Sequence, residues 1–269
     1  MRFEPTRIRV LRQDPPWKVV RAFPQPDAGT LVHLNNVSGG VLAGDRLSLR
    51  VQVDPGAAAQ ITTTGATRLY RHRAGAPDSE QHVEFIVGER ARLEYLPDPV
   101  IPYARSRHTQ CTRIHLAESA CVFWWEVLAP GRLASGESFA FERLRVESEI
   151  SSGSMPLMRE SFLLEPKKRP LAVPARLGEY SYIASLYVCQ PSREPVFWRA
   201  LEDELNSVAS ERTRHGEAIW GATTLHSGGV LVRGVTASYR VIPAALIEFW
   251  RRARKAVTGE DAIPPRKVY

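Results

Sequence analysis

The sequence predicts a mainly β protein, with a helical-β, solenoid-like or sandwich-like body of many short strands and two α-helices in the C-terminal half. Apolar residues alternate with polar ones in several short stretches, which is typical of strands with one buried face. Two later stretches instead carry apolar residues at helical spacing. Because 43% of the 269 residues are hydrophobic, the chain can bury a sizeable core, and we expect residues 1–269 to form a single domain.

The strand patterns lie mainly before position 165 and are separated by turn residues. In residues 47–53 and 83–87 every second side chain is apolar, and residues 144–150 repeat the pattern with Ser148 at one inward position. Each of these stretches therefore predicts a strand that buries one face. Residues 166–176 hold three prolines and a basic run, so they predict an exposed loop.

Three short segments resemble one another, at residues 56–61, 88–93 and 117–122. Each consists of a tight turn, an alanine, one further residue and then a large or β-branched apolar residue that opens a strand. A spacing of about thirty residues without a helical pattern suggests stacked β-rungs. The alternative interpretation is that small residues recur at turns by chance.

The first predicted helix runs from about Pro195 to Ala209, and the second from about Pro243 to Thr258. A proline suits the first turn of a helix, and Gly259 is a natural C-cap for the second one. Basic residues near the end of the second helix are favoured by the helix dipole. The expected buried stripes are Phe197, Leu201, Leu205 and Val208 in the first helix, and Leu246, Phe249, Trp250, Ala253 and Val257 in the second.

Composition excludes several classes of protein. The net charge of +7 comes mostly from arginine but is dispersed along the chain, which disfavours a nucleic-acid-binding protein. No apolar run is long enough to span a bilayer, and the N-terminus does not have the pattern of a signal peptide, so we expect a soluble, cytoplasmic protein without a membrane partner.

The sequence holds no recognisable motif for catalysis or for tight metal binding. There is no G-x-S-x-G elbow, no H-E-x-x-H and no C-x-x-C pair. His108, Cys111 and His115 are close in sequence, but in a strand His108 points to the opposite face from the other two. We therefore expect neither enzymatic activity nor a tightly bound metal or cofactor.

The most distinctive segment is residues 36–46, in which Gly39 and Gly44 have the spacing of a phosphate loop. That interpretation fails because Asp45 stands where a lysine is needed and a strand pattern follows instead of a helix. The glycines more plausibly allow a tight turn or a close approach of the backbone, with Asp45 projecting into a polar spot.

Two carboxylates, Glu94 and Glu126, lie inside predicted apolar strands. A buried carboxylate needs a partner or a wet cavity, because burying its charge alone is costly. Two interpretations remain open: an ion pair with an arginine such as Arg132, or a polar channel through the protein.

Four blocks of this sequence, in this order and spacing, are similar to the UreD (also called UreH) family of urease accessory proteins. The C-terminal helix and the Pro264-Pro265-Arg266 ending also resemble that family. Three positions differ from the usual family pattern: Val37 replaces a proline, Arg68 a lysine, and Asp98-Pro99 a Gln-Glu pair. The four blocks contain Ser38, Gly39, Gly40, Gly44 and Asp45; Thr63, Gly65, Thr67, Arg68, Tyr70 and Arg71; residues 93–97; and Gly131, Arg132, Gly136 and Glu137.

The resemblance implies a scaffold that binds UreF and, through it, the GTPase UreG, and that docks on apo-urease. In that family nickel is thought to pass through a polar tunnel, whereas GTP and the tight nickel site belong to UreG. The candidate residues for a transient nickel path are Asp45, Glu94 and Glu126. The competing interpretation makes these carboxylates structural partners of Arg46, Arg68 or Arg132. The alternative functions are a basic nucleic-acid-binding module and a hydrolase that uses the same carboxylates.

Overall fold

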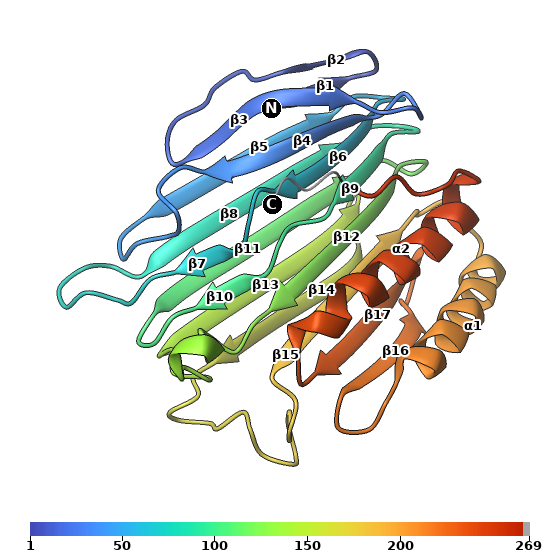
Figure 1. Cartoon of the computed structure of the whole chain (residues 1–269). Helices are drawn as coiled ribbons and strands as arrows, with labels where there is room; N and C mark the ends of the chain where they lie inside the picture. The colour runs from blue at the N-terminus through green and yellow to red at the C-terminus, as the bar shows by residue number, and fades with distance from the viewer. Residues whose placement is uncertain (266–269) are drawn as a thin grey trace.

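A computed structural model describes residues 1–265, which form two stacked β-sheets with two helices on one outer face (Figure 1). The predicted mainly β fold with two C-terminal helices is confirmed. Sheet A has the order β14-β13-β11-β8-β5-β1-β2, where the strands are β1 (Arg2–Glu4), β2 (Arg7–Arg9), β5 (Arg46–Val53), β8 (Ser79–Val87), β11 (Arg107–Leu116), β13 (Arg143–Ser152) and β14 (Met155–Leu164).

Sheet B is ten-stranded and has the main order β16-β17-β15-β12-β9-β6-β4-β3. Beside this path, β7 and β10 pair with each other, and β10 also pairs with β12. The strands of sheet B are β3 (Trp17–Pro24), β4 (Thr30–Asn36), β6 (Ala58–Thr63), β7 (Thr67–Leu69), β9 (Arg92–Tyr95), β10 (Val100–Pro102), β12 (Cys121–Leu128), β15 (Tyr182–Cys189), β16 (Ala218–Thr224) and β17 (Gly229–Thr236).

The predicted rungs are present. The chain passes from β5 to β6, from β8 to β9 and from β11 to β12, and the strands pair in parallel within each sheet. In each crossing an alanine N–H closes the turn and its side chain is buried, at Ala57, Ala91 and Ala120.

The alignment of the first repeat (residues 56–61) with the second (residues 88–93) differs from the one expected from the sequence. The match paired Gly56 with Gly88, whereas in the structure Gly56 occupies the turn position of Arg90, and both have positive φ (72° and 56°). The first two copies of the turn have a left-handed residue at this position, and glycine is only one way of supplying it. Matching by glycine therefore shifted the first copy by two residues.

The alternating stretches 47–53, 83–87 and 144–150 are confirmed as parts of β5, β8 and β13. Their apolar residues face the space between the sheets, where Val51, Phe85 and Ile150 are fully buried. Between them, polar side chains lie on the outer face of sheet A.

The helices α1 (Pro195–Arg212) and α2 (Ile242–Thr258) cover the outer face of sheet B, over β12, β15 and β17 (Figure 1). All five residues of the stripe predicted for α2 are buried, and Gly259 caps the helix with a φ of 75°. In α1 the prediction was wrong at one position, because Trp198 is buried there and Phe197 is only half-buried. Phe197 instead packs edge-on against the Trp198 ring.

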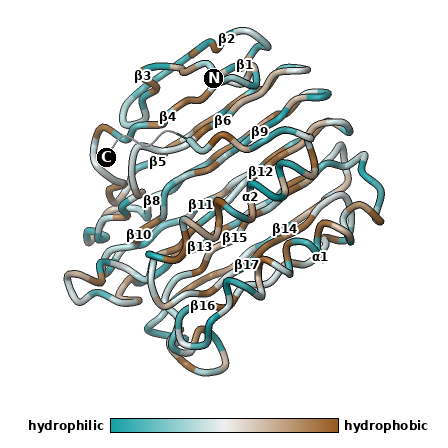
Figure 2. The backbone as a smooth tube through the Cα atoms, turned by 45° about the vertical axis from the view of Figure 1, so that its right-hand side comes forward, coloured by the Kyte–Doolittle hydropathy of each residue, from teal (hydrophilic) through white to brown (hydrophobic). Residues whose placement is uncertain are grey.

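The strands β1–β3 and the two helices lie toward opposite ends of the sandwich (Figures 1 and 2). Residues 166–176 form turns and bends with mostly exposed side chains, as predicted, although Leu171 is buried. Among residues 1–265, no helix has the length and apolar content to cross a membrane. Arg266, at the end of the Pro264-Pro265-Arg266 tail, lies outside the described residues.

Candidate functional site

The glycine loop after β4 is a tight turn that approaches the neighbouring backbone closely. Gly39 and Gly44 have φ values of 75° and 85°, which favour glycine. A Cβ on Gly40 would lie 2.6 Å from the Arg68 carbonyl oxygen and 2.5 Å from the ring of Tyr70. The predicted tight turn and close approach are both confirmed.

Three of the sequence blocks meet around Tyr70 and Tyr103. The Tyr70 hydroxyl donates to the Gly39 carbonyl (3.3 Å), and its ring packs edge-on against Tyr103 at 5.2 Å. The Arg132 guanidinium lies over the Tyr103 ring, 4.2 Å from its centroid, and donates to Glu137 (Nε to Oε2, 2.9 Å). This arrangement shows that Arg132 is not the partner of Glu94 or Glu126.

The same blocks contain a second pair of constrained glycines. Gly131 (φ 141°) has no room for a Cβ, which would lie 2.8 Å from the Glu137 carbonyl oxygen, and Gly136 caps a short 3₁₀ turn with a φ of 72°. Ser38 donates through its hydroxyl to the Gly40 carbonyl (2.8 Å), whereas Arg71 is exposed. These residues therefore form the surface next to the glycine loop (residues 36–46), which is called the motif loop below.

Asp45 closes the glycine loop. Its carboxylate accepts a hydrogen bond from the Leu42 N–H (2.8 Å), and its backbone N–H donates to the Leu42 carbonyl (3.1 Å). Its expected ion-pair partner, Arg46, lies instead near Glu80 (3.8 Å). The geometry gives Asp45 a role in the turn and does not bring it to Glu94 or Glu126.

Glu94 lies on the outer face of sheet B, beneath α2. It accepts hydrogen bonds from Arg254 Nε (2.6 Å) and Gln60 Nε2 (2.6 Å), and Arg92 Nε lies 3.5 Å away. Burial raises the pKa of Glu94, and the two arginines oppose that shift. The partner of this carboxylate is thus Arg254 in the C-terminal helix.

Arg254 belongs to the basic run at the end of α2, yet it is fully buried. Besides Glu94 it contacts Asp27 and the Asp261 carbonyl, and it lies 3.3 Å from Glu260. Gln60 also donates to the Ile263 carbonyl (3.0 Å). The network joins the β3–β4 loop, a central rung and the C-terminal segment, and the sequence pattern did not indicate it.

Glu126 lies on the other face of sheet B, between the two sheets. In β12 the residues Trp124 and Glu126 point inward, whereas Trp125 and Val127 point toward the helices. Glu94 pairs in register with Phe123, which also points toward the helices. Two of the three predicted path residues are therefore separated by the sheet itself.

Three adjacent cavities lie along the inside of the sandwich. The first, of about 190 Å³, opens at the motif loop; the second, of about 30 Å³, is a narrow passage; the third, of about 310 Å³, lies between β14 and β15. The first two share the walls Trp17, Leu34, Thr63 and Thr67, and the last two share Val100, Gln110, Glu126 and Val127.

The carboxyl of Glu126 stands between the narrow passage and the large cavity. It accepts a hydrogen bond from the Gln110 amide (2.9 Å), and among residues 1–265 no arginine, lysine or histidine lies within salt-bridge distance of it. Burial raises the pKa of Glu126 to about 8, and the nearby charge of Glu160 adds to the shift. A carboxyl with this pKa is mostly protonated at neutral pH; it becomes an anionic oxygen ligand when a dication displaces the proton, and no arginine already occupies it.

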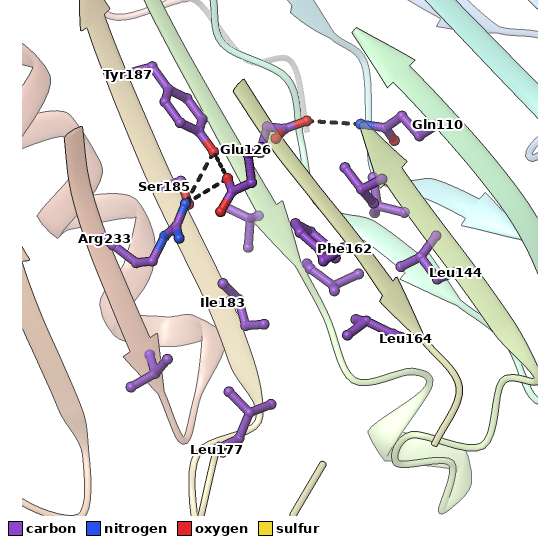
Figure 3. A pocket seen from close by; sticks show the side chains of 16 residues that line it. Gln110, Glu126, Leu144, Phe162, Leu164, Leu177, Ile183, Ser185, Tyr187 and Arg233 are labelled. Carbon is purple, nitrogen blue, oxygen red and sulfur yellow. Dashed lines mark hydrogen bonds and ion pairs between the residues drawn. The ribbon is translucent and has the colours of Figure 1, made fainter. Parts of the chain in front are cut away.

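The large cavity, which Glu126, Tyr187 and Arg233 line (Figure 3), contains a second carboxylate, Glu160 of β14. Its Oε2 accepts hydrogen bonds from the Tyr187 hydroxyl (2.6 Å) and from Arg233 (2.8 Å). Although burial alone would raise the pKa of Glu160, these two donors hold it below its usual value. The remaining walls are apolar, including Leu144, Phe162 and Ile183.

The chain matches the family model described as UreD urease accessory protein over residues 1–269. Urease accessory protein UreD of Herpetosiphon aurantiacus is 40% identical over 264 residues, which is 98% of this chain and 92% of that protein. The chain belongs to the UreD family. Proteins of the same description from Cenarchaeum symbiosum and Haloarcula marismortui are 36% and 30% identical, over 82% and 91% of this chain and 75% and 79% of theirs. The family resemblance of the sequence blocks is thereby confirmed.

UreD-family residues from the sequence blocks line the first cavity, namely Gly39, Gly40, Thr63, Gly65, Thr67 and Arg68. Two acidic residues of the interior were missed. Asp98, one of the departures from the family pattern, accepts from the Thr63 hydroxyl (2.8 Å) and lines the passage. Glu160 carried a usable signal, because it replaces an apolar residue in the alternation of Met158, Phe162 and Leu164.

Residues 1–265 contain no group of three or more His, Cys, Asp or Glu side chains that could hold a metal ion. His108 is buried and contacts Ser79 (2.9 Å), and burial lowers its pKa to about 4. Cys111 lies on the other face of β11, as the alternation predicted, and pairs in register with His82 and Glu147. The expectation that no metal is bound tightly stays a prediction.

Proposed function

We propose that this UreD-family protein is a scaffold that docks on apo-urease together with UreF and UreG and passes nickel toward the urease active site. Family membership supports the coarser role in urease maturation. The observation that carries the finer proposal is the row of three cavities, which runs from the motif loop to Glu160 inside the sandwich. A scaffold of this kind acts in the cytoplasm, by assembly and not by turnover.

The acidic residues along this row suit a cation in transit. Asp98, Glu126 and Glu160 follow one another from the passage into the large cavity. Oxygen ligands hold a borderline dication such as Ni²⁺ weakly enough to let it go, whereas nitrogen and sulfur ligands bind it more firmly. Separate carboxylates of this type favour movement over storage.

The geometry supports a different choice of path residues from the three that the sequence suggested. Glu126 lines two of the three cavities, whereas Glu94 is paired beneath α2 and Asp45 closes a turn. A hydrolase role for Glu94 is not favoured because its carboxylate is occupied by Arg254. The nucleic-acid alternative required exposed stacking rings, but Trp124, Trp125, Trp198, Trp220 and Trp250 are all buried.

Urease activation with limiting nickel tests the path. Glu126→Gln keeps the shape and one acceptor but removes the anionic ligand, so we expect the variant to fold, to bind its partners and to yield poorly activated urease. Glu211→Gln on the exposed face of α1 is the matched control and should activate urease like wild type. Full activation by Glu126→Gln would exclude the proposed path through this carboxyl.

Co-purification tests the scaffold itself. Co-expressed UreF-like and UreG-like proteins should be retained by this chain, and a chain that is purified without them would exclude the assembly role. In the same assay Asp45→Asn should reduce thermal stability before it changes nickel-limited activation, because Asp45 holds the Leu42 N–H.

A further inference from the structure

Two carboxylates facing one cavity can grip a dication, which a transit path must avoid. Glu126 and Glu160 both line the large cavity, and they are near enough for the charge of Glu160 to shift the pKa of Glu126. If both were free, they would offer up to four oxygen atoms to one metal ion, and hard or borderline dications favour such oxygen sets. Something in the cavity must therefore keep the pair from acting together.

Arg233 of β17 is placed to do this. Its guanidinium NH2 donates to Glu160 Oε2 (2.8 Å), and its Nε donates to the Ser185 hydroxyl (3.2 Å). The Tyr187 hydroxyl donates to the same carboxylate oxygen (2.6 Å), so Oε2 of Glu160 already has two donors. Glu126, by contrast, accepts from the Gln110 amide and, among residues 1–265, has no arginine or lysine within salt-bridge distance.

The contacts of Arg233 are also easily released. Its side chain is 41% exposed, so water can replace the carboxylate as its partner when the guanidinium turns away. An ion pair that is open to water contributes little net stability. Arg254, by contrast, is only 1% exposed, so water cannot replace its hydrogen-bond partners in the same way.

We propose that Arg233 is a displaceable counter-cation that occupies Glu160 and so prevents Glu126 and Glu160 from trapping the metal ion. This inference rests on the proposed passage of nickel through the cavity. A dication that reaches Glu126 meets the positive charge of Arg233 instead of a second free carboxylate. Because like charges repel strongly in a partly desolvated cavity, the ion is held by one carboxyl at a time.

Equilibrium dialysis of the purified full chain against Ni²⁺ alone tests the proposal by measuring the affinity for the metal ion. Arg233→Met removes the charge at nearly constant length, and we expect it to bind Ni²⁺ at least about tenfold more tightly than wild type, since a tenfold change is about 1.4 kcal/mol. Arg233→Lys keeps the charge and should stay within about threefold of wild type. Adding Glu160→Gln to Arg233→Met should return the affinity to the wild-type level.

An Arg233→Met variant that binds Ni²⁺ no more tightly than wild type overturns the proposal, provided that its thermal unfolding shows a folded protein. If that variant does not fold, the Ni²⁺ affinity of Arg233→Ala, in which Glu126 is unchanged, is compared with that of wild type instead. The proposed function fails separately: fully active Glu126→Gln excludes the path, whereas tightened binding in Arg233→Met would still establish the counter-cation. Equal affinity of the single variant and of the double variant with Glu160→Gln would also overturn the inference.

Discussion

Replacing Arg254 by methionine tests whether the buried network holds the C-terminal helix to the rest of the fold. The side chain contacts Glu94 (2.6 Å), Asp27, Glu260 (3.3 Å) and the Asp261 carbonyl, and it is 1% exposed. Methionine fills much of the same volume without the charge. The change therefore isolates the loss of the guanidinium from the creation of a cavity.

The expected loss of stability depends on which partners the buried carboxylates keep when Arg254 is replaced. Removing one partner of a buried ion pair typically costs about 3–5 kcal/mol, because the other charge stays buried without compensation. Here Glu94 keeps Arg92 at 3.5 Å and Gln60 at 2.6 Å, and Asp27 keeps Arg92 at 2.5 Å. We therefore expect the low end, about 3 kcal/mol, which is roughly 6–12 °C in Tm for a chain of this size.

Urea unfolding followed by far-ultraviolet circular dichroism measures the loss. The double variant Arg254→Met with Glu94→Gln should recover part of the stability, because the orphaned carboxylate is then neutral. Arg251→Met, on the exposed side of the same helix, is the matched control and should change stability by less than about 0.5 kcal/mol. A loss below about 1 kcal/mol for Arg254→Met would refute the view that this network is a structural clamp.

Three further outcomes follow from particular residues. Burial raises the pKa of Glu126 to about 8, so the folded protein is destabilised as the pH rises from about 4.5 through 8 and the carboxyl must ionise. In urea unfolding, the free energy of unfolding of Glu126→Gln should equal that of wild type near pH 4.5 and exceed it by about 2–4 kcal/mol at pH 9. Gly40→Ala should lower stability by about 1–3 kcal/mol because its Cβ meets the Arg68 backbone, while Gly65→Ala, which has open space, should stay within about 0.5 kcal/mol in thermal unfolding. Trp250→Ala should cost about 3–5 kcal/mol by leaving a cavity beneath α2, and calorimetry that shows less than 1 kcal/mol would contradict its placement in the core.

The sequence was sufficient for features that depend on near neighbours. Alternation located β5, β8 and β13, and the stripe of α2 placed every one of its apolar residues correctly. Gly39 and Gly44 also indicated their own backbone conformation. These features succeed because strand and helix periods fix side-chain direction within a few residues.

Features that depend on distant segments could not be obtained in this way. The partner of Glu94 lies 160 residues away in Arg254, and no local pattern links the two. The same limit applies to Glu126, whose neighbours Gln110, Glu160 and Arg233 come from three other strands. Burial in a strand was evident from the sequence, but which face of the sheet each carboxylate occupied required the strand register.

The network around Arg254 also bears on the order in which parts of the protein fold. Asp27 and Arg254 are 227 residues apart, and Glu260 and Asp261 follow Arg254 in the chain. When the rungs have been synthesised, Glu94 has Arg92 nearby but still lacks Arg254. Until α2 packs on sheet B, Glu94 therefore lies on an uncovered strand face, and its burial and its pairing with Arg254 happen in one late step that brings together segments far apart in the chain.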